Sequence, residues 1–90
     1  MAASLTNDDA AAVALRALAW TLDDDDRAGR LLATTGLMPD DLRARVGEPA
    51  VLAAALGYLE AFEPDLVACA DAIGERPETL VAARAALEDS

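Results

Sequence analysis

The prolines of this chain, and the glycines that precede them, restrict it to short helices. The four prolines recur every 10 to 15 residues: Pro39, Pro49, Pro64 and Pro77. Proline fits the first turn of a helix, where its missing N–H is not needed, but it breaks a helix interior. A glycine stands two or three residues before three of the four prolines, as is typical of helix ends. No helix is therefore expected to exceed about 15 residues.

Composition indicates that the segments between these boundaries are helical. About a quarter of the 90 residues are alanine, only 3% are aromatic and 54% are hydrophobic. Alanine and leucine are strong helix formers, whereas strands favour β-branched and aromatic residues. The pattern predicts helices at about 8–22, 23–35, 39–46, 49–62, 64–73 and 77–87, with Asn7 capping the first. We predict an all-α protein: one compact bundle of five to six short helices over 1–90, with frayed ends at 1–6 and 88–90.

An internal similarity at an offset of 38 residues suggests two related halves. The segment from Gly36 to Ala44 resembles that from Gly74 to Ala82, with glycine, proline, an acid, leucine and alanine at matching positions. A real duplication would make 11–48 and 49–86 two pseudo-repeated three-helix units, with the first and fourth helices equivalent at the centre. Otherwise the similarity only reflects a glycine helix end followed by a proline helix start.

The first helix carries two apolar stripes, so it is either central in the domain or half-covered by a partner. Ala11, Leu15, Leu18 and Leu22 form the stripe that we expect to be buried. The second stripe includes Trp20, and the fourth helix has a similar one with Tyr58. Aromatic residues on such a stripe are typical of interface centres. The candidate interface residues are Val13, Ala17, Trp20, Val51, Ala54 and Tyr58. The alternative is that other helices cover them.

The residues needed for common catalytic chemistry are absent or poorly placed. Histidine is missing, and both serines, Ser4 and Ser90, lie in the expected frayed ends. Cys69 lies on an apolar face and is expected to be an inert core residue. The acids at 23–26 are contiguous, unlike the alternating ligands of a calcium loop, so helix capping and ion pairs explain them better. We expect no enzyme, no cofactor and no metal.

The charge of −10 restricts the partners. Seven arginines and no lysine cannot supply a broad basic face, so nucleic acids and anionic membranes are not expected partners. The spacing predicts ion pairs from Asp23 to Arg27, Asp26 to Arg30 and Asp41 to Arg45. The second half is the more acidic, and a basic partner would be expected there. Its candidate contacts are Glu60, Glu63, Asp65, Asp71, Glu75 and Glu78.

The order of segments resembles a family of short alphaproteobacterial proteins of unknown function. The similarity is carried by residues 14–20, 26–37, 39–43 and 49–52 and by the closing helix from Pro77. This resemblance implies a small helical cytoplasmic protein, and it implies no activity and no site residues. A single cysteine also suits a reducing cytoplasm. The N-terminus lacks the charge and apolar run of a signal peptide, and no stretch approaches the length of a membrane span.

Two functional hypotheses follow. The first is a non-enzymatic interaction or adaptor module that binds an unknown protein partner or forms a homodimer. The alternative is an acidic inhibitor or mimic that occupies a basic, nucleic-acid-binding surface of another protein. The first rests on the apolar stripes, and the second rests on the net charge.

Overall fold

The computed structural model describes residues 5–89, and within that range the chain is helical, with short connections and no strand. The elements are α1 (Asn7–Leu22), α2 (Asp25–Thr35), α3 (Pro39–Arg45), α4 (Pro49–Ala61), α5 (Glu63–Ile73) and α6 (Pro77–Glu88). The predicted all-α bundle of short helices is confirmed. All four prolines lie in the first turn of a helix, as expected.

The first two helices begin at different residues from those predicted. Thr6, and not Asn7, caps α1, because its side-chain oxygen accepts a hydrogen bond of 3.0 Å from the N–H of Asp9. Thr6 belongs to the expected frayed end 1–6, of which residues 1–4 lie outside the described range. Asp24 caps α2 by accepting from the N–H of Arg27 at 3.0 Å. The acidic run therefore divides between the end of α1, the cap and the first turn of α2.

The two predicted Gly-to-Pro turns share a backbone conformation. Gly36 and Gly74 both have φ of +75°, the left-handed region that favours glycine. After Gly74 the N–H of Glu75 bonds to the carbonyl of Ala70, which makes a Schellman ending. Gly36 instead donates a single bond to the carbonyl of Leu32, the simpler left-handed ending. The two turns therefore share a left-handed glycine and differ in their hydrogen bonds.

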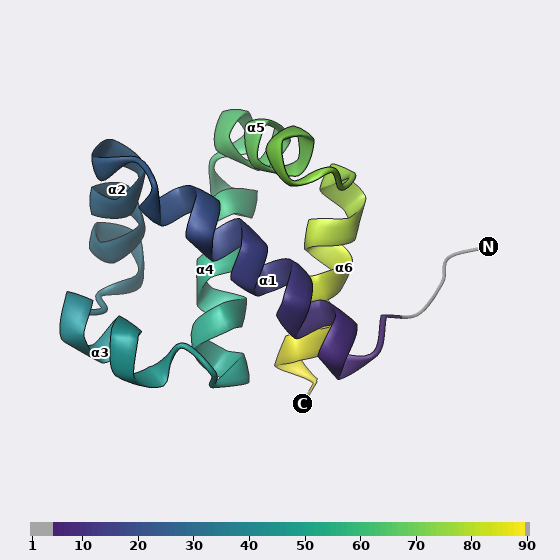
Figure 1. Ribbon diagram of the computed structural model, residues 1–90, viewed down its shortest axis with the longest axis horizontal. Helices are drawn as coiled ribbons and strands as arrows, with labels where there is room; N and C mark the ends of the chain where they lie inside the picture. The colour runs from purple at the N-terminus through teal and green to yellow at the C-terminus, as the bar shows by residue number, and fades with distance from the viewer. Residues whose placement is uncertain (1–4, 90) are drawn as a thin grey trace.

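The core lies where α1, α4 and α6 pack together (Figure 1). Small residues occupy the contact face of α1, where Ala10, Ala14 and Ala17 are almost fully buried. Leucines fill the space behind them, including Leu56 of α4 and Leu80 of α6, both 0% exposed. Alanines at the contacts allow the helix axes to approach closely, and the leucines contribute most of the buried apolar surface.

The α3 helix is attached to this core only lightly. Leu42 is its one buried residue, and α3 does not pack extensively on any other helix. The corresponding helix of the second half, α6, packs on both α1 and α4. The two halves are therefore similar in their turns and different in their packing. This difference opens a groove beside α3.

Candidate interaction surface

The outward face of α1 is apolar and uncovered. Leu15 and Leu22 are 43% and 41% exposed, and Ala12 and Ala19 are also exposed on the same side of the helix. We call Ala12, Leu15, Ala19 and Leu22 the α1 stripe. In Figure 1, α1 runs across the front of the molecule over α4, and no other helix is drawn in front of it. The stripe is available to a partner.

This arrangement differs in part from the expected roles of the two α1 faces. Of the stripe predicted to be core, Leu15 and Leu22 are exposed, and Leu18 is buried. The second stripe is the covered one, since Val13 is 5% exposed and Ala17 is 1% exposed. The smaller side chains face inwards because α1 lies close against α4 and α6.

The six candidate interface residues consequently do not form one accessible surface. Four are covered by the chain's own helices: Val13, Ala17, Val51 and Tyr58. Trp20 and Ala54 are partly buried, on α1 and on α4 respectively. For the four buried residues the interface prediction is corrected, because a partner of the folded chain could not reach them.

A groove continues from the end of the α1 stripe. It is a cavity of about 370 Å³ between α1, α2 and α3, and Leu22 belongs to both the stripe and the groove. The other lining residues are Leu18, Ala28, Leu32, Pro39, Leu42, Arg43 and Val46. The lining is almost wholly apolar, with the Arg43 guanidinium as its one charged group. Such a surface is suited to apolar side chains and has no constellation of groups for chemistry.

Charge on the surface is divided between paired and unpaired groups. Every arginine is engaged within the chain, six in ion pairs with acids and Arg27 on Trp20. None of the three predicted Asp–Arg pairs forms, because Arg27 stacks on Trp20, Arg30 pairs with Asp65 and Arg45 with Glu48. The C-terminal acids are largely neutralised as well, since Glu60, Asp65, Glu75 and Glu78 each have an arginine partner.

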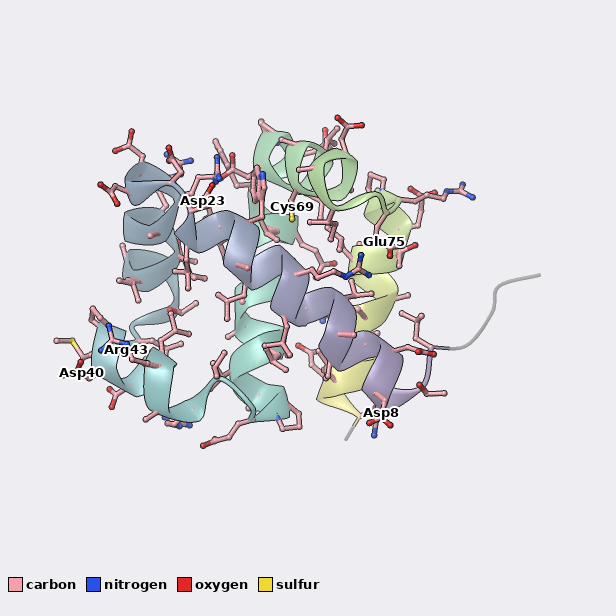
Figure 2. All side chains as sticks on the ribbon, in the orientation of Figure 1. Asp8, Asp23, Asp40, Arg43, Cys69 and Glu75 are labelled. Atoms are coloured by element: carbon pink, nitrogen blue, oxygen red, sulfur yellow. The ribbon has the colours of Figure 1, made fainter. Side chains whose placement is uncertain are left out.

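Unpaired carboxylates flank the α1 stripe. Asp8 and Asp9 lie in the first turn of α1, and Asp23, Asp25 and Asp26 follow its last turn. Within residues 5–89 none of these five forms an ion pair with an arginine. Figure 2 labels Asp8 and Asp23 at the two opposite ends of α1. An apolar strip with negative charge at both ends is the main feature of this face.

A second cluster joins α2 to α4 and α5. Arg30 Nε donates to Tyr58 Oη at 3.3 Å and Arg30 Nη2 to Asp65 Oδ2 at 3.0 Å, while the Tyr58 hydroxyl donates to the same carboxylate. Burial acts to raise the pKa of Asp65, but the hydrogen bonds from Tyr58 and Arg30 outweigh it and lower that pKa. Burial, with the bond to Asp65, raises the pKa of Tyr58. The groups satisfy one another, so the cluster holds helices together.

The aromatic and sulfur groups beside this cluster are also structural. The Arg27 guanidinium lies 3.7 Å from the centroid of the Trp20 ring, and its Nη2 donates to the Trp20 carbonyl at 2.6 Å. Trp20 thus anchors the start of α2. Cys69 is 0% exposed, and burial raises the pKa of its thiol to about 11, so it stays a protonated core residue.

Neither a metal centre nor a membrane span is found in the described residues. Over 5–89, no three side chains among cysteine, aspartate and glutamate gather as a cation site would require. No helix in the same range is long and apolar enough to cross a bilayer.

Comparison with known sequences and structures gives a family without an activity. Residues 7–90 match a family described as a protein of unknown function, DUF3572. No curated protein and no solved structure matches the chain.

Proposed function

Because the chain belongs to the DUF3572 family, whose description assigns no activity, we propose a function from its surface: it is a non-enzymatic module that binds another protein. The binding face is the α1 stripe together with the groove between α1, α2 and α3. The proposed interface therefore lies on the opposite face of α1 from the second stripe, which carried the candidate residues predicted from the sequence.

One observation carries the proposal. Leu15 and Leu22 are more than two-fifths exposed on one helix face, and Leu22 leads into an apolar groove. Single exposed leucines are ordinary on protein surfaces, but contiguous apolar surface is typical of interaction sites. Within the described residues the other large exposed apolar side chains lie on separate elements: Met38, Phe62, Val67 and Val81.

We also propose that this module belongs to the cytoplasm of a bacterium. The bacterium would be an alphaproteobacterium, because the sequence resembles a family of alphaproteobacterial proteins. Two features support this proposal. The thiol of Cys69 is unpaired and buried in the core, and the basic residues of the chain are all arginines. A buried single cysteine has no partner for an intramolecular disulfide, which agrees with a reducing compartment.

The alternative of an acidic inhibitor that covers a nucleic-acid-binding surface has less support. It rests on the net charge, and it requires a broad face of unpaired carboxylates. Four of the six C-terminal acids expected to contact a basic partner are paired with arginines. Glu63 and Asp71 are the two that have no ion pair in residues 5–89, and two acids do not make a broad face.

Site-specific photo-cross-linking in the native cell tests the proposal. A photoreactive phenylalanine analogue replaces Leu15 in one variant and Val67 in the matched control. Val67 is 51% exposed on α5, so the two probes are similarly accessible and lie on different helices. We expect a discrete cross-linked protein, or a second copy of this chain, from position 15 and not from position 67. The same products from both positions, or none from position 15, would overturn the proposed function.

A further inference from the structure

The exposed face of α1 has the spacing of a seam that receives one partner helix. Asp8, Ala12, Leu15, Ala19 and Leu22 follow one another at intervals of four, three, four and three residues. This is the heptad spacing of coiled-coil contacts, and all five positions are exposed. With a rise of about 1.5 Å per residue, the seam is about 21 Å long. A partner segment of about four helical turns would cover it.

The side chains of the seam define how a helix would fit. Leucines at 15 and 22 would insert between the side chains of the partner, and the alanines at 12 and 19 leave room for close approach of the backbones. Beyond Leu22 the groove offers space for one or two further apolar side chains, because it opens between α1 and α3. The occupant therefore has leucine-sized residues on one helix face.

Charge decides against a second copy of this chain as the occupant. Two α1 helices packed in parallel would place Asp8 against Asp8 and Asp23 against Asp23. In the antiparallel arrangement, Asp8 and Asp9 of one copy would face the acids at 23, 25 and 26 of the other. Either arrangement brings unpaired carboxylates together at both ends of the seam, and both copies carry a net charge of −10. Like charges in contact oppose association.

We propose that the α1 seam and the adjoining groove bind an amphipathic helix of another protein, with a leucine-rich face and basic residues at both ends. This inference rests on the proposed function and names the class of partner. Lysine or arginine side chains of the partner, about four turns apart, would pair with Asp8 and Asp9 at one end and with the acids after Leu22 at the other. The apolar contacts supply most of the affinity, and the charges select a basic partner and its placement.

Three synthetic 18-residue peptides test this directly with the full chain. The first repeats leucine and alanine at heptad spacing with lysine in its first and last turns and glutamine at the other positions, the second replaces each lysine by glutamate, and the third scrambles the first so that no apolar face remains. Affinity is measured by calorimetry at about 50 mM salt, where exposed charges interact over about 14 Å. We expect the lysine peptide to bind at least tenfold more tightly than either of the others.

Two sets of variants locate the binding. Removing one charge at each end of the seam, with Asp8→Asn and Asp23→Asn combined, should weaken binding of the lysine peptide about tenfold. The matched control, Glu63→Gln with Asp71→Asn, removes unpaired acids of α5 and should leave its affinity unchanged. Leu15→Asp should abolish binding while helicity and cooperative unfolding persist, because Leu15 is exposed.

Each contrary result overturns the inference in a recognisable way. Equal affinity for the lysine and glutamate peptides, or an unchanged affinity in the charge variant beside the seam, would refute a basic partner. An apolar interaction module would still be supported. A dimer in sedimentation that Leu15→Asp dissociates makes a second copy the occupant. No binding by any peptide at millimolar concentration also refutes the inference, whereas the proposed function itself fails only if position 15 gives no specific cross-link in the cell.

Discussion

The α3 and α6 helices follow the same kind of turn and differ in what they bury. Each comes after a glycine at φ of +75° and begins with a proline. The α6 helix is 12 residues long and buries Leu80, Ala83 and Leu87, whereas α3 has seven residues and buries only Leu42. A local turn signal therefore fixes where a helix starts, and helix length and apolar spacing decide how firmly it is held.

The difference determines where a partner can bind. At the α6 end the chain closes its own core over α1 and α4, and an ion pair between Arg84 and Glu60 crosses that contact. At the α3 end the core remains open as the groove beside Leu22. The α6 helix is therefore held more firmly than α3, although a cavity of about 570 Å³ also lies between the start of α4 and the end of α6.

Truncating one core leucine on each helix should give the largest contrast. Leu80→Ala removes a side chain that is 0% exposed between α6, α1 and α4, and should lower the free energy of unfolding by about 3–4 kcal/mol. Leu42→Ala should lower it by only about 1–2 kcal/mol, because its surroundings can collapse around the loss. Urea unfolding followed by circular dichroism measures both. Equal losses would mean that α3 is as firmly packed as α6.

The boundaries of the helices were predictable because their cause is local. Proline is not tolerated in a helix interior, and glycine readily adopts φ of +75°. Residue type alone therefore predicted the ends of α3, α4 and α6 to within a residue or two. Arginine partners were not predictable. Arg27 stacks on the Trp20 ring instead of pairing with Asp23, and Arg30 pairs with Asp65, which is 35 residues away in the sequence. Such choices depend on the packing of helices that spacing along one helix does not describe.

The inner face of α1 was predicted wrongly for a physical reason. Leucine has the larger apolar surface, so the stripe with Leu15 and Leu22 was expected inside. The close contact of α1 with α4 and α6 instead selects small residues, and Ala10, Ala14 and Ala17 lie there. Heptad spacing could not have separated the two faces, because the buried residues Ala10, Ala14, Ala17 and Thr21 have the same spacing as the exposed ones.

Substituting the two turn glycines tests whether the turns are equivalent. Alanine is strained at φ of +75°, so Gly36→Ala and Gly74→Ala should each destabilise the chain by about 1–2 kcal/mol. Gly29→Ala is the control: Gly29 lies inside α2 with open space around an added Cβ, and alanine there should stabilise by about 0.5–1 kcal/mol. Thermal unfolding of the three variants measures this. A much smaller loss of stability for Gly36→Ala than for Gly74→Ala would show that the packing of the following helix, and not the turn, determines the loss.

The smallest effect concerns the bridge between the two halves, where Arg30 of α2 meets Tyr58 and Asp65. Asp65→Asn should lower stability by about 1 kcal/mol at pH 7, because a charge-assisted bond is lost. Folding lowers the pKa of Asp65, so the stabilisation that its carboxylate contributes is complete at pH values above its ordinary pKa of 3.8. This stabilisation disappears as the pH falls through the folded-state pKa, which lies below that value.

Urea unfolding of both proteins between about pH 2 and pH 7 measures this difference, since the expected window lies around and below the ordinary carboxyl pKa. Asp71→Asn, at an acid of the same helix without an ion pair in residues 5–89, should leave the free energy of unfolding at pH 7 nearly unchanged. Hydrogen exchange should also become faster in α2 than in α6 when Asp65 is replaced, because α6 has its own attachment to α1 and α4. If the gap in stability persisted at about pH 2, the hydrogen bonds of the ionised carboxylate would not be its cause. The stabilisation of α2 would then come from packing around Tyr58, which is itself buried.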